Sequence, residues 1–240
     1  PDADQEEVAG LVARYDLLAI PVTDVDGTML GVITVDDVID VITEEATQDI
    51  YNLAGLSEED RIFTSARVSI RKRLPWMLVN LCTAFGAGAI VGLFEGTLER
   101  MVSLAIFLPV VAGIGGNGGI QTLTVITRAI ALGEIEFSSG MRAVGKEMFV
   151  GLVVGSAAGV ISGAIAYLLH GNLYMGLVLF LAMIVTMVTA SLVGAAVPLI
   201  LKAMGQDPAL GSGILVTFAA DALGFFSFLG IATLLLDRIA

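Results

Sequence analysis

Five long apolar segments constrain this chain more than any other feature of its sequence. Each is about twenty residues or longer, the length that a helix needs to cross a hydrocarbon core of about 30 Å. Only 15% of the residues are charged, against about 25% in soluble domains. We therefore expect an all-α polytopic membrane domain, with spans near residues 75–94, 101–127, 148–169, 173–201 and 210–236.

The first 65 residues differ from the rest in charge. They carry sixteen acids and two bases, whereas residues 66–240 carry eight acids and ten bases, which together give the net charge of -12. An acidic, water-facing region is thus joined to an apolar one. The opening PDADQEE is acidic, unlike a secretory signal. Because the sequence does not begin with Met, we expect a further part of the protein upstream.

Lysine and arginine gather on one side of the predicted membrane. Seven of them flank the spans on the side of the N-terminal region, and only two flank the other side. Because cytosolic loops carry the excess of these residues, we predict a multi-pass protein of the cell membrane. Its N-terminus lies in the cytosol and, after five spans, its C-terminus lies outside. The seven are Arg71, Lys72, Arg73, Arg128, Arg142, Lys146 and Lys202, and the two are Arg100 and Arg238.

The N-terminal region is typical of a small α+β unit. Residues 18–22 and 30–34 are predicted strands, joined through the hairpin-favouring pair Asp26–Gly27. A helix capped by Asp36 or Asp37 is expected to follow. So small a unit cannot bury a full core, so it is expected to pair with further chain, with a second subunit, or with both.

The predicted helix and its continuation to Leu56 are acidic on their polar face. Two interpretations stay open. The face is either simply solvated, as most charge runs are, or it senses a divalent cation that relieves repulsion between carboxylates. The acids are Asp36, Asp37, Asp40, Glu44, Glu45 and Asp49.

Asp221 is the single ionisable residue of the segment 210–236. It lies about 16 Å from the start of that segment, near the midplane of the membrane. A carboxylate there costs at least about 2.5 kcal/mol on insertion scales, and no Lys or Arg lies at a comparable depth. A cation path, a proton relay and a neutral buried acid are all possible, and the first is favoured. Thr217 and Gly224 share its helix face.

One carboxylate per chain contributes a single negative charge, and a divalent ion needs two. A two-fold homodimer that turns both copies of Asp221 toward one axis supplies them. Mg2+ dehydrates reluctantly and suits a few carboxylates with retained waters, whereas Ca2+ prefers six to eight direct oxygens. Mg2+ is therefore the expected ion.

The segment LPVVAGIGGNGGIQ contains Pro109 and five glycines. It predicts a helix that is broken beside water or inside protein, with Asn117 offering a side-chain oxygen. Close helix packing through glycine is the alternative. The four-residue spacing of glycines in 151–163 predicts packing alone. Asp207–Pro208 is expected to cap the last span, and Pro198 to kink or end the fourth.

Together, several stretches resemble the MgtE family of Mg2+ channels over residues 14–237. They are IPVTDVDGTMLGVITVDDVIDVI, EEATQDIYNLAG, LPVVAGIGGNGGIQ, GKEM and DPALGSGILVTFAADALG. The resemblance implies the C-terminal part of a CBS domain in 1–43, a plug helix and connector in 44–70, and a five-helix pore domain in 71–240. It also implies a homodimer that closes when cytosolic Mg2+ is high.

The resemblance assigns roles to individual residues. Asp221 in FAADALG matches the family's pore carboxylate. The expected cytosolic Mg2+ sensor is formed by acids of the CBS part and plug with two acids of the membrane domain. These are Asp16, Asp37, Glu45 and Asp49, with Glu147 and Asp207.

The predicted function is a channel that imports Mg2+ down its electrochemical gradient, in the lipid bilayer and without a nucleic-acid partner. A carrier coupled to Na+ or H+ is the alternative, because a lone membrane acid and a broken helix suit it too. An intramembrane hydrolase is disfavoured, because aspartyl types need two membrane acids. We therefore expect no enzyme.

Overall fold

The computed structural model describes residues 1–56, 60–135 and 137–239. Within them, five helical segments are long and apolar enough to cross a membrane, which confirms the five predicted spans. The first and third helices begin well before the predicted apolar stretches, because their basic and polar first turns are also helical. The segments are α3 (Ala66–Gly92), η1 with α5 (Val102–Phe107 and Leu108–Ala131), α6 (Phe137–His170), α7 (Leu173–Ala203) and α8 (Ser212–Leu234).

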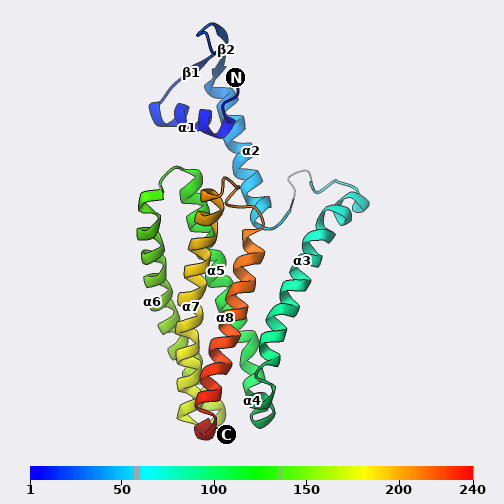
Figure 1. The fold of residues 1–240 in the computed structure, drawn as a ribbon, viewed down its shortest axis with the longest axis vertical. Helices are drawn as coiled ribbons and strands as arrows, with labels where there is room; N and C mark the ends of the chain where they lie inside the picture. The colour runs from blue at the N-terminus through cyan, green and yellow to red at the C-terminus, as the bar shows by residue number, and fades with distance from the viewer. Residues whose placement is uncertain (57–59, 136, 240) are drawn as a thin grey trace.

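Helices α5, α6, α7 and α8 form a bundle, and α3 stands at its side (Figure 1). Within the membrane α3 approaches the bundle at α8, where Gly86 faces the ring of Phe218. Two short helices, α4 (Glu95–Arg100) and α9 (Leu236–Ile239), close the end that holds the C-terminus. The N-terminal region lies at the opposite end of the long axis (Figure 1), as an odd number of spans requires.

The α6–α7 contact depends on the predicted glycine stripe. A Cβ atom added at Gly159 would lie 2.8 Å from the carbonyl oxygen of Phe180, and one at Gly163 would lie 2.7 Å from that of Gly176. Only residues without a side chain let two membrane helices approach so closely. The packing role predicted for this stripe is confirmed.

The predicted break in the second span is wrong. Helix α5 is continuous, and Pro109 sits in its first turn, where a missing N–H costs nothing. Its glycines instead admit neighbouring side chains. A Cβ atom at Gly115 would lie 2.6 Å from Cγ2 of Thr186, and one at Gly118 would lie 2.6 Å from Cε of Met187. Close packing, the alternative drawn from the sequence, is what the glycines provide.

Two further boundaries differ from expectation. Helix α7 continues past Pro198 to Ala203, so this proline does not end the helix. Helix α8 begins after Gly211, which has a φ of 62° and forms its N-cap, and not at Asp207. The Asp207 side chain accepts a hydrogen bond from the Ala209 amide at 2.8 Å, so it caps the turn that precedes the helix.

The N-terminal region contains the two predicted strands, β1 (Ala19–Thr23) and β2 (Met29–Thr34), as an antiparallel hairpin. Helix α1 (Gln5–Tyr15) precedes them and was not predicted. Helix α2 (Val35–Leu53) follows them. A small apolar core joins the two helices through Ala9, Val12 and Val38, as expected for a unit that cannot bury a full core.

The cap of α2 is Thr34 and not Asp36 or Asp37. The Thr34 amide and hydroxyl donate to the Asp37 carboxylate at 3.3 and 2.8 Å, which closes a capping box. From this cap the helix runs without interruption to Leu53. It therefore passes through residue 43, where the sequence placed the end of the CBS part.

Candidate functional site

Asp221 lies halfway along α8 and is half-buried. Its carboxylate forms no hydrogen bond or ion pair with any residue that the structure describes. The α8 face that carries Ala220 and Gly224 is buried against the bundle, and Phe218 faces Gly86 of α3. Asp221 lies between these two contacts, at the margin of the buried surface.

Thr217 lies one turn before Asp221 and is also half-buried. A Cβ atom added at Gly116 of α5 would lie 3.8 Å from Cγ2 of Thr217. Helix α5 therefore comes close to α8 at the level of Thr217. Asn117 of α5 is exposed, and no hydrogen bond joins it to Asp221 in the described part of the chain. Thr217 and Asp221 thus lie together, and Asn117 does not meet them within one subunit.

A single chain offers only one carboxylate at this depth. Across residues 1–56, 60–135 and 137–239, no group of three or more His, Cys, Asp or Glu side chains could hold a metal ion. Asp221 alone therefore cannot hold a stripped cation. It can face a hydrated one together with a second negative charge.

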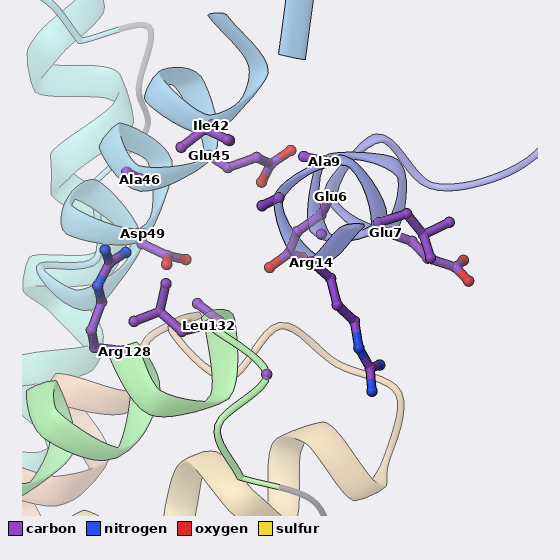
Figure 2. A pocket seen from close by; sticks show the side chains of 15 residues that line it. Glu6, Glu7, Ala9, Arg14, Ile42, Glu45, Ala46, Asp49, Arg128 and Leu132 are labelled. Atoms are coloured by element: carbon purple, nitrogen blue, oxygen red, sulfur yellow. The ribbon is translucent and has the colours of Figure 1, made fainter. Parts of the chain in front are cut away.

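A second set of acids meets at the end of the molecule that carries α1 and α2. A cavity of about 820 Å3 lies between α1, α2 and the end of α5. Figure 2 shows Glu45 and Asp49 projecting from α2 into the space that Glu6 enters from α1, with Arg128 of α5 beside Asp49. Gln5 ties the two helices together, since its side-chain amide donates to Glu45 at 2.7 Å.

The acids of this cavity repel one another. Burial raises the pKa of Asp49, the carboxylates of Asp207 and Glu45 raise it further, and Arg128 opposes them. Burial also raises the pKa of Glu6, followed by the charges of Glu45 and Asp49. We call Glu6, Glu45, Asp49 and Asp207 the acid cluster. Glu7 and the two arginines Arg14 and Arg128 also line the cavity, so the acids outnumber the bases and form a field that attracts a cation. The described side chains do not form a ready set of direct ligands, so the ion that this field suits is a hydrated one.

The acid cluster is tied directly to the start of α8. The Asn52 side chain donates to the Asp207 carboxylate at 2.7 Å, and the Gly211 amide donates to the Asn52 carbonyl at 3.3 Å. The Leu53 carbonyl lies 2.5 Å from where a Cβ atom of Gly213 would be. The C-terminal end of α2 is thus seated on the first turn of the helix that carries Asp221.

The structure brings together three of the six predicted sensor residues, Glu45, Asp49 and Asp207. The other three lie elsewhere. Asp16 ends α1 in a left-handed conformation with a φ of 51°, and Asp37 is engaged with Thr34. Glu147 is buried in α6, where Lys146 donates to it at 2.6 Å and Thr122 at 3.3 Å.

Sequence reasoning missed Glu6 and Arg128 as residues of this acidic cavity. Glu6 lies on α1, which was not predicted, although Val8, Leu11 and Val12 have the spacing of a helix face. Arg128 was used only to orient the spans. No local pattern places either residue against α2, because the contact is tertiary.

Comparisons with known proteins identify the family to which the chain is similar. The family model MgtE, described as a divalent cation transporter, matches residues 108–231. The CBS domain model matches residues 1–44.

Three relatives carry the name magnesium transporter MgtE. The protein of Bacillus subtilis is 35% identical over 96% of this chain and 51% of its own length. The protein of Thermus thermophilus is 37% identical over 99% of this chain and 53% of its own length. The protein of Enterococcus faecalis is 34% identical over 96% of this chain and 51% of its own length. The chain spans about half the length of these curated relatives.

Proposed function

Since the chain belongs to the MgtE family of divalent cation transporters, we propose that it is a Mg2+ channel that imports the ion through a homodimeric pore. The observation that carries this proposal is Asp221, a carboxylate halfway along a membrane helix with no partner in the described chain. Such an acid is costly unless water or a cation reaches it. The relatives named for magnesium transport support Mg2+ as the substrate.

Two copies of Asp221 on one two-fold axis match the charge of one divalent ion. A hydrated Mg2+ keeps its waters between itself and the carboxylates. Thr217, one turn away, adds a hydroxyl that can accept hydrogen bonds from those waters. We place Asn117 on the face of α5 that a second subunit would have to meet, since it is exposed in one chain.

The acid cluster suits regulation by cytosolic Mg2+. Without a cation its carboxylates repel one another and push α1 and α2 away from the membrane domain. A bound, hydrated Mg2+ screens that repulsion and also attracts carboxylates of α1, α2 and the membrane domain at once, and this added attraction favours the docked arrangement. Because Asn52 and Leu53 contact the start of α8, docking of α2 reaches the pore helix directly. Under this proposal 44–70 acts as plug and connector between the CBS part in 1–43 and the pore domain in 71–240.

The same proposal sets the orientation. The acid cluster senses cytosolic Mg2+ only if α1 and α2 lie in the cytosol, and the excess of Lys and Arg on that side supports this. The C-terminus then lies outside the cell membrane. Import follows from the negative inside potential, which drives a divalent cation inward.

A carrier coupled to Na+ or H+ is the second candidate, because a lone half-buried acid can also bind a proton. Proteoliposomes that hold equal Mg2+ on both sides distinguish the two. Imposing an inward H+ or Na+ gradient is expected to accumulate no Mg2+, whereas an inward Mg2+ gradient or a negative inside potential drives uptake. Accumulation driven by H+ or Na+ at zero potential would replace the channel with the carrier. Protein-free vesicles give the leak.

A further inference from the structure

A tight turn precedes α3 and displays two apolar side chains. The Thr64 amide donates to the Arg61 carbonyl at 2.9 Å, and the Arg61 amide donates to the Thr64 hydroxyl at 3.0 Å. These bonds close the turn and leave Ile62 and Phe63 at its tip, 89% and 97% exposed. Two adjacent large apolar side chains that an ordered turn holds in the open are suited to an apolar surrounding.

A buried carboxylate fixes this turn beside α3. Asp60 is 5% exposed, and Ser69 and Arg73 both donate to its carboxylate at 2.5 Å. These hydrogen bonds, chiefly that from Arg73, lower the pKa of Asp60 and keep it ionised. Because Ser69 and Arg73 hold Asp60, the turn that follows Asp60 is anchored to the first two turns of α3.

Three exposed arginines lie in this turn or in the first two turns of α3. Arg61, Arg67 and Arg71 are exposed, and none of them forms an ion pair within the described parts of the chain. The continuous apolar part of α3 starts at Leu74. At 1.5 Å per residue, Arg71 and Arg67 lie roughly 5 and 10 Å above that point. The headgroup layer reaches about 5–8 Å beyond the hydrocarbon on each side, so Arg71 starts within this layer and Arg67 starts just above it, from where its long side chain can reach down to the phosphates.

We propose that this turn and the first two turns of α3 bind anionic phospholipid. The arginines pair with the lipid phosphates, and Ile62 and Phe63 enter the boundary between headgroups and acyl chains. Arginine forks match phosphate geometry, and basic residues just cytosolic of a span favour anionic leaflets. The site holds the connector between α2 and the membrane domain at the bilayer surface. It does not depend on the transport proposed above.

The apolar tip distinguishes a lipid from other anions. A free phosphate would need only the arginines and would leave Ile62 and Phe63 in water. A soluble protein partner would have to reach residues at headgroup depth, beside a span. Only a phospholipid offers a phosphate and an apolar layer together, which the exposed arginines and the exposed apolar pair would both contact.

The test measures lipid retention by the full chain. The purified protein is titrated with phosphatidylglycerol or with phosphatidylcholine of the same acyl chains, and bound lipids are counted by native mass spectrometry. Arg67→Gln with Arg71→Gln is expected to lower retention of phosphatidylglycerol by on the order of tenfold. Arg142→Gln with Lys202→Gln is the matched control, because it removes the same charge at the same membrane side, and it is expected to change nothing.

A second pair of substitutions tests the apolar contact. Ile62→Ser with Phe63→Ser leaves every arginine in place and is expected to lower phosphatidylglycerol retention several-fold. Three results would overturn the proposal. They are unchanged retention in the arginine variant, an equal loss in the matched control, and unchanged retention in the serine variant, which would mean that the arginines bind any phosphate. Retention is read without transport, so a failure of the channel proposal leaves this test intact.

Discussion

Replacing Asp221 with asparagine is expected to reduce Mg2+ flux by about a hundredfold or more. Asparagine has nearly the same shape, so α8 keeps its packing, but a dimer loses both negative charges. Even at the dielectric constant of water, a divalent ion about 5 Å from each of two carboxylates gains roughly 3 kcal/mol. Since 1.4 kcal/mol is tenfold, that energy corresponds to at least a hundredfold change in occupancy.

The measurement is Mg2+ uptake into proteoliposomes, read with an internal fluorescent indicator under an inward gradient. Asp237→Asn is the matched control. It makes the same substitution at an exposed acid that pairs with Arg100 at 3.1 Å, and it is expected to conduct as the unchanged protein does. Normal flux through the Asp221 variant would mean that the Asp221 carboxylate is not needed for conduction.

Alanine at both Glu45 and Asp49 is expected to weaken inhibition by cytosolic Mg2+ strongly. A bridging ion supplies the attraction that holds α2 in its docked position, and alanine can bind no ion. The variant should therefore conduct at Mg2+ concentrations that close the unchanged channel, with the half-inhibiting concentration raised on the order of tenfold or more. Patch-clamp recording of the cytosolic face with stepped Mg2+ reads this shift.

Two further substitutions on α2 test whether inhibition by Mg2+ depends on the acid cluster or on any acidic residue of this helix. Asp40→Ala removes an exposed acid that does not line the cavity, and it should leave inhibition intact. Adding Asp37→Ala to the double variant should change little, because that carboxylate is engaged with Thr34. Normal inhibition in the Glu45 and Asp49 variant would mean that these acids form only a solvated helix face.

The spans and the position of Asp221 halfway along a membrane helix could be predicted from the sequence, whereas the packing of α5 could not. Length and hydropathy are local properties, so five helices and the isolation of Asp221 follow from the chain directly. Whether Gly115 breaks a helix or admits a neighbour depends on what lies opposite, and that is Thr186 of α7. No pattern within residues 101–127 contains that information.

The acid cluster shows the same division. Glu45 and Asp49 could be found because they share one face of one helix, and Asp207 because its motif resembles the family. Glu6 and Arg128 come from two other elements, and only the docking of α1 and α5 on α2 brings them together. Asp207 also has a second role that its motif did not indicate, since it receives the Asn52 amide and joins α2 to α8.

The central claim is that water and cations reach Asp221, and cysteine accessibility tests it most directly. The chain has one native cysteine, so Cys82→Ser gives a clean background for Asp221→Cys and for Leu223→Cys, whose native side chain is 42% exposed on the outer side of the same helix. The account predicts that a water-soluble, positively charged thiol reagent modifies the cysteine at 221 and spares the one at 223. A cysteine at 221 that reacts only with a lipid-soluble reagent would place this residue outside any aqueous passage and contradict the account.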